Sequence, residues 1–341
     1  MRQNPIRFGL IGTGRIGQVH AANIAANPAA ELVGIADPFI DGAKSVASRF
    51  GGTVTDSPEQ LIHSRQLDAV LVASPTPTHV ELIEACVDAG LPVLCEKPID
   101  LDIVRVDALR PKVAASGVPV ALGFNQRFDP SFARVHTRVL AGEIGDLEHL
   151  SIVSRDPGPP PASYIGVSGG IFRDMTIHDF DMARFFVGDI IEVSATGARL
   201  FDTGAREHGD FDTAVVTLRA ASGAIVTITN SRHSAIGYDQ RLEAFGALGM
   251  LQVGNAQSSL VSYSSGSAVE ARDPYIEPFI ERYAQAYALE LDEFIKRVRG
   301  EHSSSPNFED GRAALMIADA AQRSAEEGIA VSIASALPIA N

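Results

Sequence analysis

Short apolar segments alternate with amphipathic segments over the first third of the chain. Each apolar segment is continuous, which is typical of a strand that is buried on both faces of a sheet. The segments between them repeat apolar residues at helical spacing, so the pattern predicts a parallel sheet with helices on both sides. The predicted strands cover residues 6–12, 31–37, 68–74, 92–98 and 119–124, and the predicted helices cover residues 19–27, 43–50, 79–90 and 103–115.

After about Phe124 the pattern changes to longer segments in which apolar and polar residues alternate. Alternation with a period of two predicts strands that have one buried face and one solvated face. The connections between these strands are short, which indicates a largely antiparallel sheet. The predicted strands cover residues 147–156, 191–201, 211–220, 223–232, 240–247 and 250–255.

The two patterns predict two domains, 1–122 and 123–341, in a chain of 341 residues. A single hydrophobic core rarely grows beyond about 250–300 residues, so this length is consistent with two. The expected fold class is α/β plus α+β, with a parallel sheet followed by an open, largely antiparallel sheet flanked by helices. Residues 280–299 and the segment after Pro306 predict further helices in the second domain, and the last of these is free to pack back on the first domain.

Charge restricts the partners. The chain has 28 basic and 42 acidic residues, a net charge of -14, which repels phosphate backbones and anionic membrane surfaces. We therefore expect neither nucleic acid nor a membrane as a partner, and no apolar run reaches the roughly 18 residues of a membrane span. The amino-terminal segment lacks the features of a signal peptide.

Two cysteines, Cys86 and Cys95, are too few for a disulfide framework and do not have the spacing of metal ligands. Both lie in apolar patterns, so we expect them to be buried as small hydrophobic residues. The simplest location for such a chain is the reducing cytoplasm.

Gly12, Gly14 and Gly17 form a G-x-G-x-x-G motif that follows the first strand and begins the first helix. In this context the first glycine allows a tight turn, the second lets the backbone approach a pyrophosphate, and the third lets the helix pack on the strand. We expect the backbone N–H groups at the start of the helix, at Arg15 and Ile16, to bind phosphate oxygens. The motif predicts a Rossmann dinucleotide site, although the glycine pattern alone also occurs in other loops.

Asp37 ends the second strand, 20 residues after Gly17. A carboxylate at this position accepts hydrogen bonds from the ribose 2′-hydroxyl and repels a 2′-phosphate. Pro38 and Phe39 follow and supply no guanidinium to offset that repulsion. We therefore predict NAD rather than NADP as the cofactor.

Two further loops follow strands at the edge of the sheet where ligands of open α/β folds bind. Ser74, Thr76 and His79 follow the third predicted strand, where the sequence VASPTPTH fits a cofactor contact and an ordinary rigid loop equally well. Glu96 and Lys97 follow the next strand, directly before Pro98. A lysine at this edge is more probable as a functional group than as a solvated charge.

A polar stripe interrupts the half-apolar segment 167–186. If the segment from Asp174 onward is helical, Asp174, His178 and Asp181 project from one face, because successive residues rotate by about 100°. Three interpretations remain open from spacing alone. In the first, the stripe is a set of catalytic residues that transfer a proton. In the second, Asp174 caps the helix while His178 and Asp181 lie at the surface. In the third, Asp174 and His178 share a metal ion. Because no further cysteine or histidine lies near them in the sequence, we predict no metal.

These motifs together resemble the Gfo/Idh/MocA oxidoreductase family, and within it the inositol 2-dehydrogenases. The resemblance covers nearly the whole chain in order, and the E-K-P motif with the D-x-x-x-H pair is more specific than the glycine loop. It includes E-K-P at 96–98, GFNQRFDPSF at 123–132, SRDPGPPPASYI at 154–165, GGIFRDMTIHDFDMARFF at 169–186 and GYDQR at 237–241.

The resemblance implies roles for individual residues. In that family a Rossmann domain binds NAD and an open sheet covers the nicotinamide. Lys97 is implied near substrate and nicotinamide, Asp174 as a partner of a substrate hydroxyl, and His178 as the proton acceptor. Arg127, Asp156 and Tyr238 match substrate-binding positions. The family's members tend to be homotetramers that associate through the open sheet.

The first hypothesis for function is NAD-dependent oxidation of a cyclitol ring hydroxyl, from myo-inositol to 2-keto-myo-inositol (scyllo-inosose). A histidine accepts the hydroxyl proton at neutral pH because its ordinary pKa is near 6.5, and a lysine ammonium stabilises developing alkoxide charge. A related scyllo-inositol or sugar dehydrogenase uses the same machinery. A non-catalytic NAD-binding regulator is the rival from another class, since folds are reused.

Overall fold

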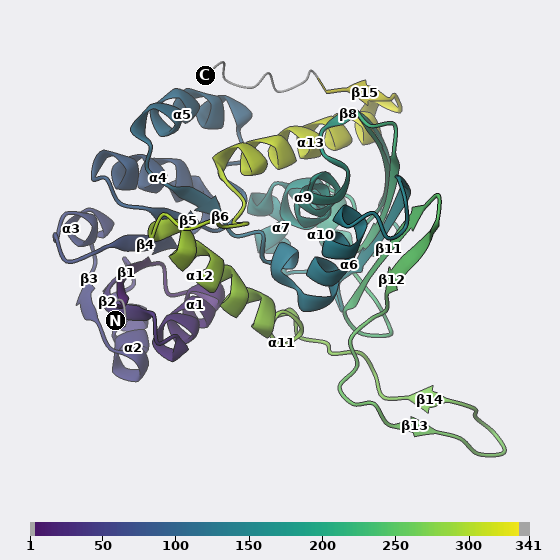
Figure 1. Ribbon diagram of the computed structural model, residues 1–341, viewed down its shortest axis with the longest axis horizontal. Coiled ribbons are helices and arrows are strands. Elements are labelled where there is room, and N and C mark those ends of the chain that lie inside the picture. The colour runs from purple at the N-terminus through teal and green to yellow at the C-terminus, as the bar shows by residue number, and fades with distance from the viewer. Residues whose placement is uncertain (1–3, 334–341) are drawn as a thin grey trace. The chain divides into compact units, whose positions relative to one another are not determined.

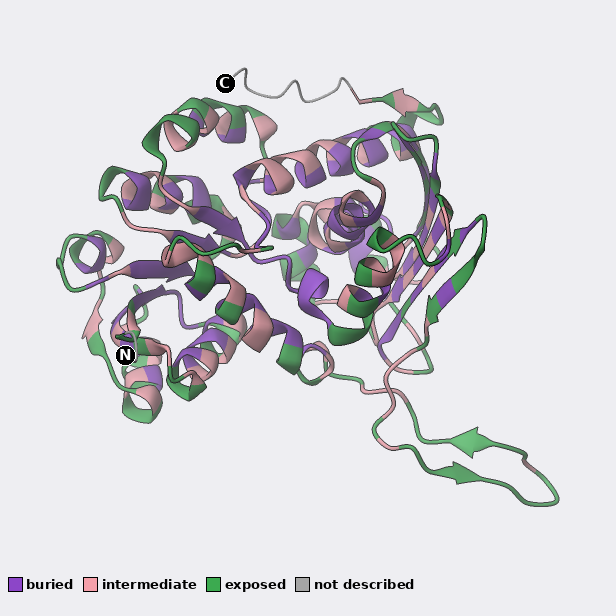
Figure 2. Cartoon of the chain, in the orientation of Figure 1, coloured by how far each residue is buried: buried purple, intermediate pink, exposed green. Residues whose placement is uncertain are grey.

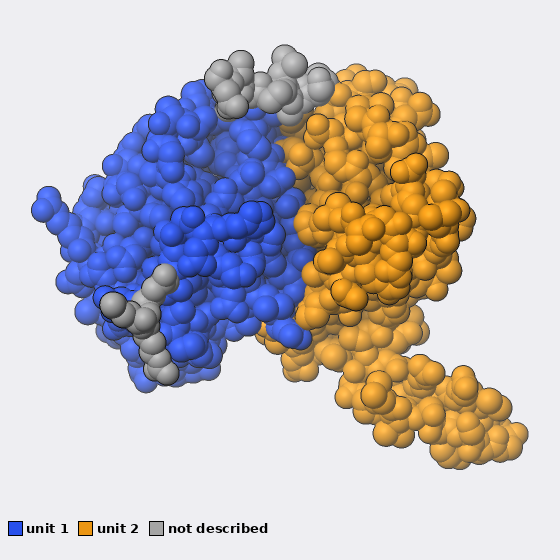
Figure 3. Space-filling model, in the orientation of Figure 1, with its two compact units in different colours: residues 1–128, 285–312 blue, residues 129–284, 313–341 orange. Residues whose placement is uncertain are grey.

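The structure is a computed structural model that describes residues 4–333, and the chain divides into two compact units (Figure 3). The first unit is formed by the chain up to Phe128 together with Gln285–Arg312, and the second by Asp129–Ala284 together with the chain from Ala313 onward. Residues 1–3 and 334–341 of the predicted domains lie outside the described residues.

The first unit is built on a six-stranded sheet in which all neighbouring strands are parallel, as predicted. The strand order is β3-β2-β1-β4-β5-β6, which places the reversal of chain direction across the sheet between β1 and β4. The strands are β1 (Ile6–Ile11), β2 (Ala30–Ala36), β3 (Thr53–Thr55), β4 (Ala69–Val72), β5 (Val93–Cys95) and β6 (Val120–Leu122).

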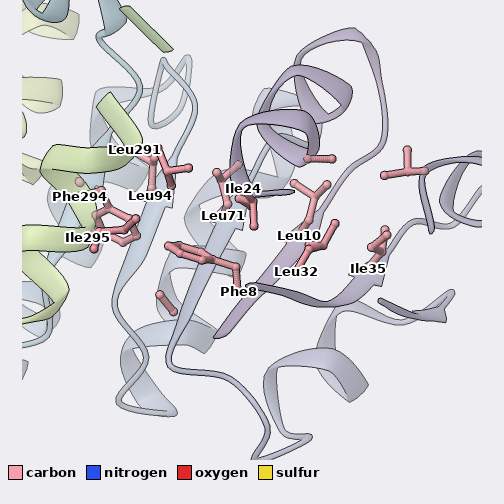
Figure 4. Close-up of a cluster of buried hydrophobic side chains, with 14 of the residues drawn as sticks. Phe8, Leu10, Ile24, Leu32, Ile35, Leu71, Leu94, Leu291, Phe294 and Ile295 are labelled. Atoms are coloured by element: carbon pink, nitrogen blue, oxygen red, sulfur yellow. The ribbon is translucent and has the colours of Figure 1, made fainter. Parts of the chain in front are cut away.

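Helices cover both faces of this sheet (Figure 1). On one face, Phe8, Leu10 and Leu71 pack with side chains from α1, α2 and α12 in one continuous hydrophobic core (Figure 4). Helices α3, α4 and α5 belong to the other side, where α3 contacts β1 and β2 and α4 contacts β4 and β5. The helices are α1 (Arg15–Ala26), α2 (Ile40–Phe50), α3 (Pro58–Ile62), α4 (His79–Asp88), α5 (Ile103–Ser116) and α12 (Ala284–Val298), with short 3₁₀ helices η1 (Thr76–Thr78) and η2 (Asn125–Phe128).

Helix α12 is the main departure from the expected organisation. The sequence pattern placed residues 280–299 with the second domain, but Leu291, Phe294 and Ile295 are buried in the core of the first unit. Phe294 packs against Phe8 of β1 with ring centroids 6.1 Å apart. An amphipathic pattern shows that a helix buries one face, but it does not show which core receives that face.

The second unit is built on a seven-stranded sheet in the order β12-β11-β7-β10-β9-β8-β15. Only the pairing of β7 with β10 is parallel among its described strands, so the sheet is largely antiparallel, as predicted. Figure 2 shows burial alternating along these strands. The strands are β7 (Leu147–Arg155), β8 (Ile190–Ala198), β9 (Thr213–Ala220), β10 (Ile225–Ser231), β11 (Asp239–Gly246), β12 (Gly249–Val253) and β15 (Val331–Ser332).

Helices cover one face of this second sheet. Helix α6 contacts β11 and β12, and α9 contacts β7 and β10. The hydroxyl of Ser324 in α13 accepts a hydrogen bond of 2.8 Å from the backbone N–H of Ala195 in β8. The helices are α6 (Pro130–Leu140), α7 (Ala162–Ser168), α8 (Gly170–Asp174), α9 (Thr176–Val187), α10 (Thr203–Glu207), α11 (Phe279–Arg282) and α13 (Phe308–Glu327), of which α13 begins in the first unit.

A long hairpin extends from the end of β12 and was not predicted. It carries β13 (Ser262–Tyr263) and β14 (Ala271–Arg272), and Figure 1 shows it projecting away from the sheet of its own unit. Its apolar side chains are largely exposed: Leu260 is 98% exposed and Val269 is 82% exposed.

Both cysteines are buried and unpaired, as predicted. Burial raises the pKa of the Cys86 thiol to about 12, so it is held as a neutral, inert side chain. Within residues 4–333, no helix has both the length and the apolar character that crossing a membrane requires.

Candidate active site

The glycine loop connects β1 to α1. Gly12 has φ +94°, and a Cβ built on it would lie 2.6 Å from the backbone of Ala73. A Cβ on Gly17 would lie 2.1 Å from the carbonyl oxygen of Gly12, whereas a Cβ on Gly14 would meet no atom within 4 Å. The first and third glycines are therefore required by packing, and the second faces open space in front of the first turn of α1. This cradle fits a dinucleotide pyrophosphate, which the N–H groups from Arg15 onward would bind.

Asp37 lies beside this loop, at the carboxyl end of β2. Its Oδ2 accepts hydrogen bonds from the backbone N–H and the hydroxyl of Thr13, at 2.7 and 2.6 Å, and its Oδ1 accepts one from the N–H of Phe39 at 2.8 Å. A carboxylate oxygen accepts two hydrogen bonds, so Oδ1 keeps capacity for a ribose hydroxyl. The residues present therefore fit the predicted adenosine end of NAD, and they include Thr13, which the sequence did not single out.

The loop after β4 carries the predicted residues Ser74, Thr76 and His79. The hydroxyl of Ser74 lies 2.6 Å from that of Thr78, and Thr76 begins η1. His79 is buried, and its ring nitrogens lie 2.7 Å from the carbonyl oxygen of Pro98 and 2.8 Å from that of Ser74. The imidazole thus joins the loops that follow β4 and β5. Contact of these three residues with the cofactor stays a prediction.

Glu96 and Lys97 follow β5, as predicted, at the same edge as the glycine loop. Glu96 Oε1 lies 2.7 Å from Nε2 of His20, which α1 contributes. The His20 ring packs edge-on against Tyr287 of α12, with centroids 5.6 Å apart. Lys97 is half-buried. Glu96 is therefore tied to the helix that the glycine loop begins.

Arg127 lies in η2, after β6, and is buried. Its Nη2 is 3.3 Å from Oδ1 of Asp310. This ion pair compensates a guanidinium that would otherwise be buried without a counter-charge. Arg127 is placed at the same strand edge as Lys97, and its predicted contact with substrate stays a prediction.

The expected continuous helix from Asp174 onward is wrong in one respect. The backbone breaks at Met175, which separates α8 from α9, so Asp174 is the last residue of α8 and His178 lies in the first turn of α9. The alternative in which Asp174 caps the helix is also wrong, because the N-cap residue of α9 is Met175 and makes no side-chain capping bond. The break turns Asp174 toward other partners.

Those partners are Tyr164 and Arg232. The hydroxyl of Tyr164 donates to Asp174 Oδ1 at 2.9 Å, and Nη1 of Arg232 donates to Oδ2 at 3.1 Å. Arg232 also donates to Asp210 Oδ2 at 3.3 Å. The sequence did not single out Arg232, Asp210 or Tyr164 as site residues. No periodicity marks a buried arginine, and the only available signal was its place directly after an apolar strand.

His178 is half-buried, whereas the neighbouring Asp179 and Asp181 are fully buried. A surface location for Asp181 is therefore wrong. Asp179 Oδ2 accepts a hydrogen bond of 2.7 Å from Asn230 in β10. Burial raises the pKa of Asp179 to about 7 and the charge of Asp156 adds to the rise, against the opposing effect of the Asn230 hydrogen bond.

Asp156 and Tyr238 lie at neighbouring strand ends of the same unit. Asp156 follows β7, and its backbone N–H donates to the carbonyl oxygen of Ser231 at 2.9 Å. Tyr238 directly precedes β11 and packs edge-on against Tyr283, with ring centroids 5.9 Å apart. Their predicted contact with substrate stays a prediction.

Two family models match the chain, one over the region of each sheet. Residues 6–124 match the family model described as an oxidoreductase family with an NAD-binding Rossmann fold. Residues 132–252 match the model of the Gfo/Idh/MocA C-terminal domain. These matches confirm the predicted family resemblance, the fold class and NAD as the cofactor.

Several relatives match over nearly the whole length. An inositol 2-dehydrogenase of Rhizobium meliloti is 43% identical and covers 96% of this chain and 99% of its own. The crystal structure of a myo-inositol dehydrogenase from Corynebacterium glutamicum is 51% identical, with a TM-score of 0.94, covering 97% of this chain and 100% of its own. That of a scyllo-inositol dehydrogenase from Lactobacillus casei, with bound NAD(H) and scyllo-inositol, is 29% identical, with a TM-score of 0.90 and coverage of 97% and 100%.

Proposed function

Because the chain belongs to the Gfo/Idh/MocA oxidoreductase family, we propose that it oxidises a ring hydroxyl of myo-inositol to the 2-keto product. The observation that carries this proposal is 51% identity to a myo-inositol dehydrogenase over 97% of the chain. When bound, NAD would supply the acceptor for the hydride that leaves the carbinol carbon. The chain's own residues then have to bind the ring, orient one C–H bond and remove the hydroxyl proton.

We assign to His178 the role of accepting the proton from the substrate hydroxyl. Oxidation of a carbinol breaks the C–H and O–H bonds, and neutral imidazole is a suitable acceptor for the O–H proton at neutral pH. Lys97 acts on the same hydroxyl, where its ammonium group offsets the negative charge that develops on oxygen. Asp174 accepts a hydrogen bond from a substrate hydroxyl, and its place beside Tyr164 and Arg232 supports that role.

Recognition of the remaining hydroxyls is assigned to Arg127, Asp156 and Tyr238. A cyclitol presents hydroxyl groups around the whole ring, so its site needs both donors and acceptors. These three side chains supply a guanidinium, a carboxylate and a phenol at strand ends. Glu96 and the residues of the glycine loop and the β4 loop are assigned to the cofactor.

The test is a kinetic screen of the purified protein. Myo-inositol, scyllo-inositol and a panel of aldoses are offered with NAD and with NADP, and reduction is followed at 340 nm. Turnover that is fastest with myo-inositol and NAD supports the proposal. The second candidate is a scyllo-inositol dehydrogenase, which is supported by the Lactobacillus casei relative. Tight NAD binding without turnover on any polyol would indicate a regulator.

We also propose a homotetramer that associates through the open sheet. The face of that sheet without helices exposes apolar side chains, among them Val215, Ile225 and Met250, each about half exposed. The hairpin after β12 is a two-stranded ribbon, which is marginal on its own in water, and it carries the exposed Leu260. Burial of these groups against other copies supports association. Light scattering tests this against four times the chain mass of 36.1 kDa.

A cytoplasmic location is proposed as well. Its support is the pair of buried, unpaired cysteines, which agrees with a reducing compartment. Fractionation of cells that express the protein tests this location.

A further inference from the structure

The guanidinium of Arg232 joins two carboxylates inside the second unit. Nη1 donates to Asp174 Oδ2 at 3.1 Å, and Nη2 donates to Asp210 Oδ2 at 3.3 Å. The Arg232 side chain is only 1% exposed, and its backbone N–H donates to the carbonyl oxygen of Asp212 at 2.8 Å. Both the main chain and the side chain of this residue are therefore fixed.

We propose that Arg232 is a positioning residue, which holds the Asp174 carboxylate in the orientation that accepts a hydrogen bond from a substrate hydroxyl. The inference deepens the proposed function and rests on it, because Asp174 meets substrate only if the chain is a polyol dehydrogenase. It assigns no chemical step to Arg232 itself.

The two carboxylates that Arg232 contacts have different roles in balancing its charge. A buried cation needs a counter-charge, and one carboxylate is sufficient to supply it. The Asp210 side chain is 5% exposed and its Oδ1 also accepts the N–H of Ile171 at 2.9 Å, so Asp210 is the internal counter-ion. Asp174 is 14% exposed and is the carboxylate with access to a ligand. The second arm of the guanidinium is thus left to orient Asp174.

Arg232 stays charged throughout the working pH range. Burial acts to lower its pKa, but the carboxylates of Asp174 and Asp210 raise it by more, so the net shift is upward. A planar guanidinium also offers two separate N–H donors at fixed angles, which suits one residue that has to hold two carboxylates. An ammonium group is a single point charge and does not reproduce that geometry.

Tyr164 completes the arrangement from the other side of Asp174. Its hydroxyl donates to Oδ1 while Arg232 donates to Oδ2, so each carboxylate oxygen has one fixed donor. The two donors together fix the plane of the carboxylate, and that plane sets the direction from which a substrate hydroxyl would donate to Asp174.

The competing interpretation is that Arg232 only ties α8, β10 and the segment before β9 together. Both interpretations predict some loss of stability on substitution, so stability does not distinguish them. Kinetics do when Arg232 is compared with Arg173, whose ion pair with Asp319 also holds α8. A purely structural tie should give the two substitutions similar effects on kcat/KM. A positioning role affects the polyol and leaves the affinity for NAD unchanged.

The experiment compares Arg232→Met, Arg232→Lys and a matched control, Arg173→Met. Arg173 lies on α8 beside Asp174 but pairs with Asp319 at 2.7 Å. We expect Arg232→Met to lower kcat/KM for myo-inositol about 100-fold, the scale of a 1 Å misplacement, with the Kd for NAD within twofold of wild type. Arg232→Lys should recover only part of that loss, less than tenfold, because one ammonium group does not hold both carboxylates, and millimolar guanidinium should partly rescue Arg232→Ala. Arg173→Met should keep wild-type kinetics.

Wild-type kcat/KM in a folded Arg232→Met variant would overturn the proposal. If Arg232→Met does not fold, Arg232→Lys becomes the test. Wild-type kinetics in Arg232→Lys would equally overturn the proposal, because a single ammonium group cannot hold both carboxylates. A crystal structure of Arg232→Lys separates this result from failure of the proposed function. The Asp174 carboxylate should leave the Tyr164 hydroxyl whether or not the wild-type protein oxidises a polyol, and an unmoved carboxylate contradicts the positioning role.

Discussion

Thr13 donates two hydrogen bonds to Asp37, from its backbone N–H at 2.7 Å and from its hydroxyl at 2.6 Å. Thr13 lies between the first two glycines of the loop, and Asp37 directly follows β2. The glycine loop and the carboxylate that we predict to select the cofactor are therefore one connected structure. A change in either residue should alter how the adenosine end of NAD is held.

Asp37→Ala should weaken NAD binding more than NADP binding. The variant removes an acceptor for the ribose 2′-hydroxyl and also removes the charge that repels a 2′-phosphate. A hydrogen bond to a charged group contributes about 1.5–3 kcal/mol, so we expect KM for NAD to rise roughly tenfold or more. Steady-state kinetics with both cofactors measure this. Asp41→Ala, at an exposed position on α2, is the control, and an unchanged NAD/NADP ratio in Asp37→Ala would defeat the assignment.

His178→Ala should reduce kcat by roughly 10²- to 10⁴-fold, the usual contribution of a general base. The side chain is half-buried in the first turn of α9, so its loss should leave the fold intact. Stopped-flow and steady-state rates with myo-inositol measure the effect, and His302→Ala, at an exposed position, serves as the control. Near-wild-type turnover would remove His178 as the base.

The sheets were predictable because their residues carry the burial pattern directly. Thr217 and Arg219 are exposed while Val216, Leu218 and Ala220 are buried, and this alternation along β9 is visible in the sequence. The glycine loop and Asp37 were predictable for a similar reason, since local chemistry fixes their roles. Lys97 was singled out by its place directly after an apolar strand at the ligand-binding edge, and the family resemblance supplied its role near substrate and nicotinamide.

The features of the fold and the site that could not be predicted depend on contacts between segments distant in the sequence. Arg232 meets Asp174 across 58 positions and Asp210 across 22, and in the sequence it looks like any polar residue after a strand. The break at Met175 has no glycine or proline to mark it. The sequence of α12 shows an amphipathic helix but does not indicate that Phe294 packs on Phe8 of the first unit.

Activity should survive removal of metal ions. Hydride transfer to NAD needs no metal when a lysine offsets the alkoxide charge, and we assign that charge to Lys97. Dialysis against EDTA, followed by an assay with myo-inositol and NAD, is expected to leave kcat and KM unchanged. Loss of activity that zinc restores would support the metal interpretation of Asp174 and His178.

Asp179 should make the free energy of unfolding depend on pH. Its pKa is about 7 in the folded chain, raised by burial from the ordinary value of 3.8. Between these two values the native state keeps a proton that the unfolded chain releases, so stability falls as pH rises. The slope from this group is roughly 1.4 kcal/mol per pH unit between about pH 4 and pH 7, and it vanishes below and above that range because both states then hold the same number of protons.

Denaturant unfolding of wild type and Asp179→Asn from pH 4 to 8 measures this dependence. The difference between the two curves should slope below pH 7 and become flat above it, because Asn230 keeps a partner but the titrating proton is gone. Asp56→Asn, at an exposed position, should run parallel to wild type. Parallel curves for Asp179→Asn as well would show that Asp179 does not titrate in this range.

Substitutions at Gly14 and Gly17 should separate cofactor binding from folding. Gly14 has extended backbone angles, φ -62° and ψ -170°, and a Cβ there meets nothing within 4 Å. Gly14→Ala should therefore leave the melting temperature of the cofactor-free protein unchanged while it weakens NAD roughly tenfold, because the methyl group occupies space that the pyrophosphate needs.

Gly17→Ala is the matched variant in which stability, rather than NAD affinity, should change first. Alanine favours a helix by about 1 kcal/mol over glycine, but its Cβ would lie 2.1 Å from the Gly12 carbonyl oxygen, and overpacking of this kind costs about 1–3 kcal/mol or more. Calorimetry should show a lower melting temperature for the cofactor-free variant, and titration calorimetry measures NAD affinity for both. The absence of a Cβ should matter for NAD affinity at Gly14 and for stability at Gly17. If Gly14→Ala lost stability and kept NAD affinity, the space in front of α1 would not be the pyrophosphate site.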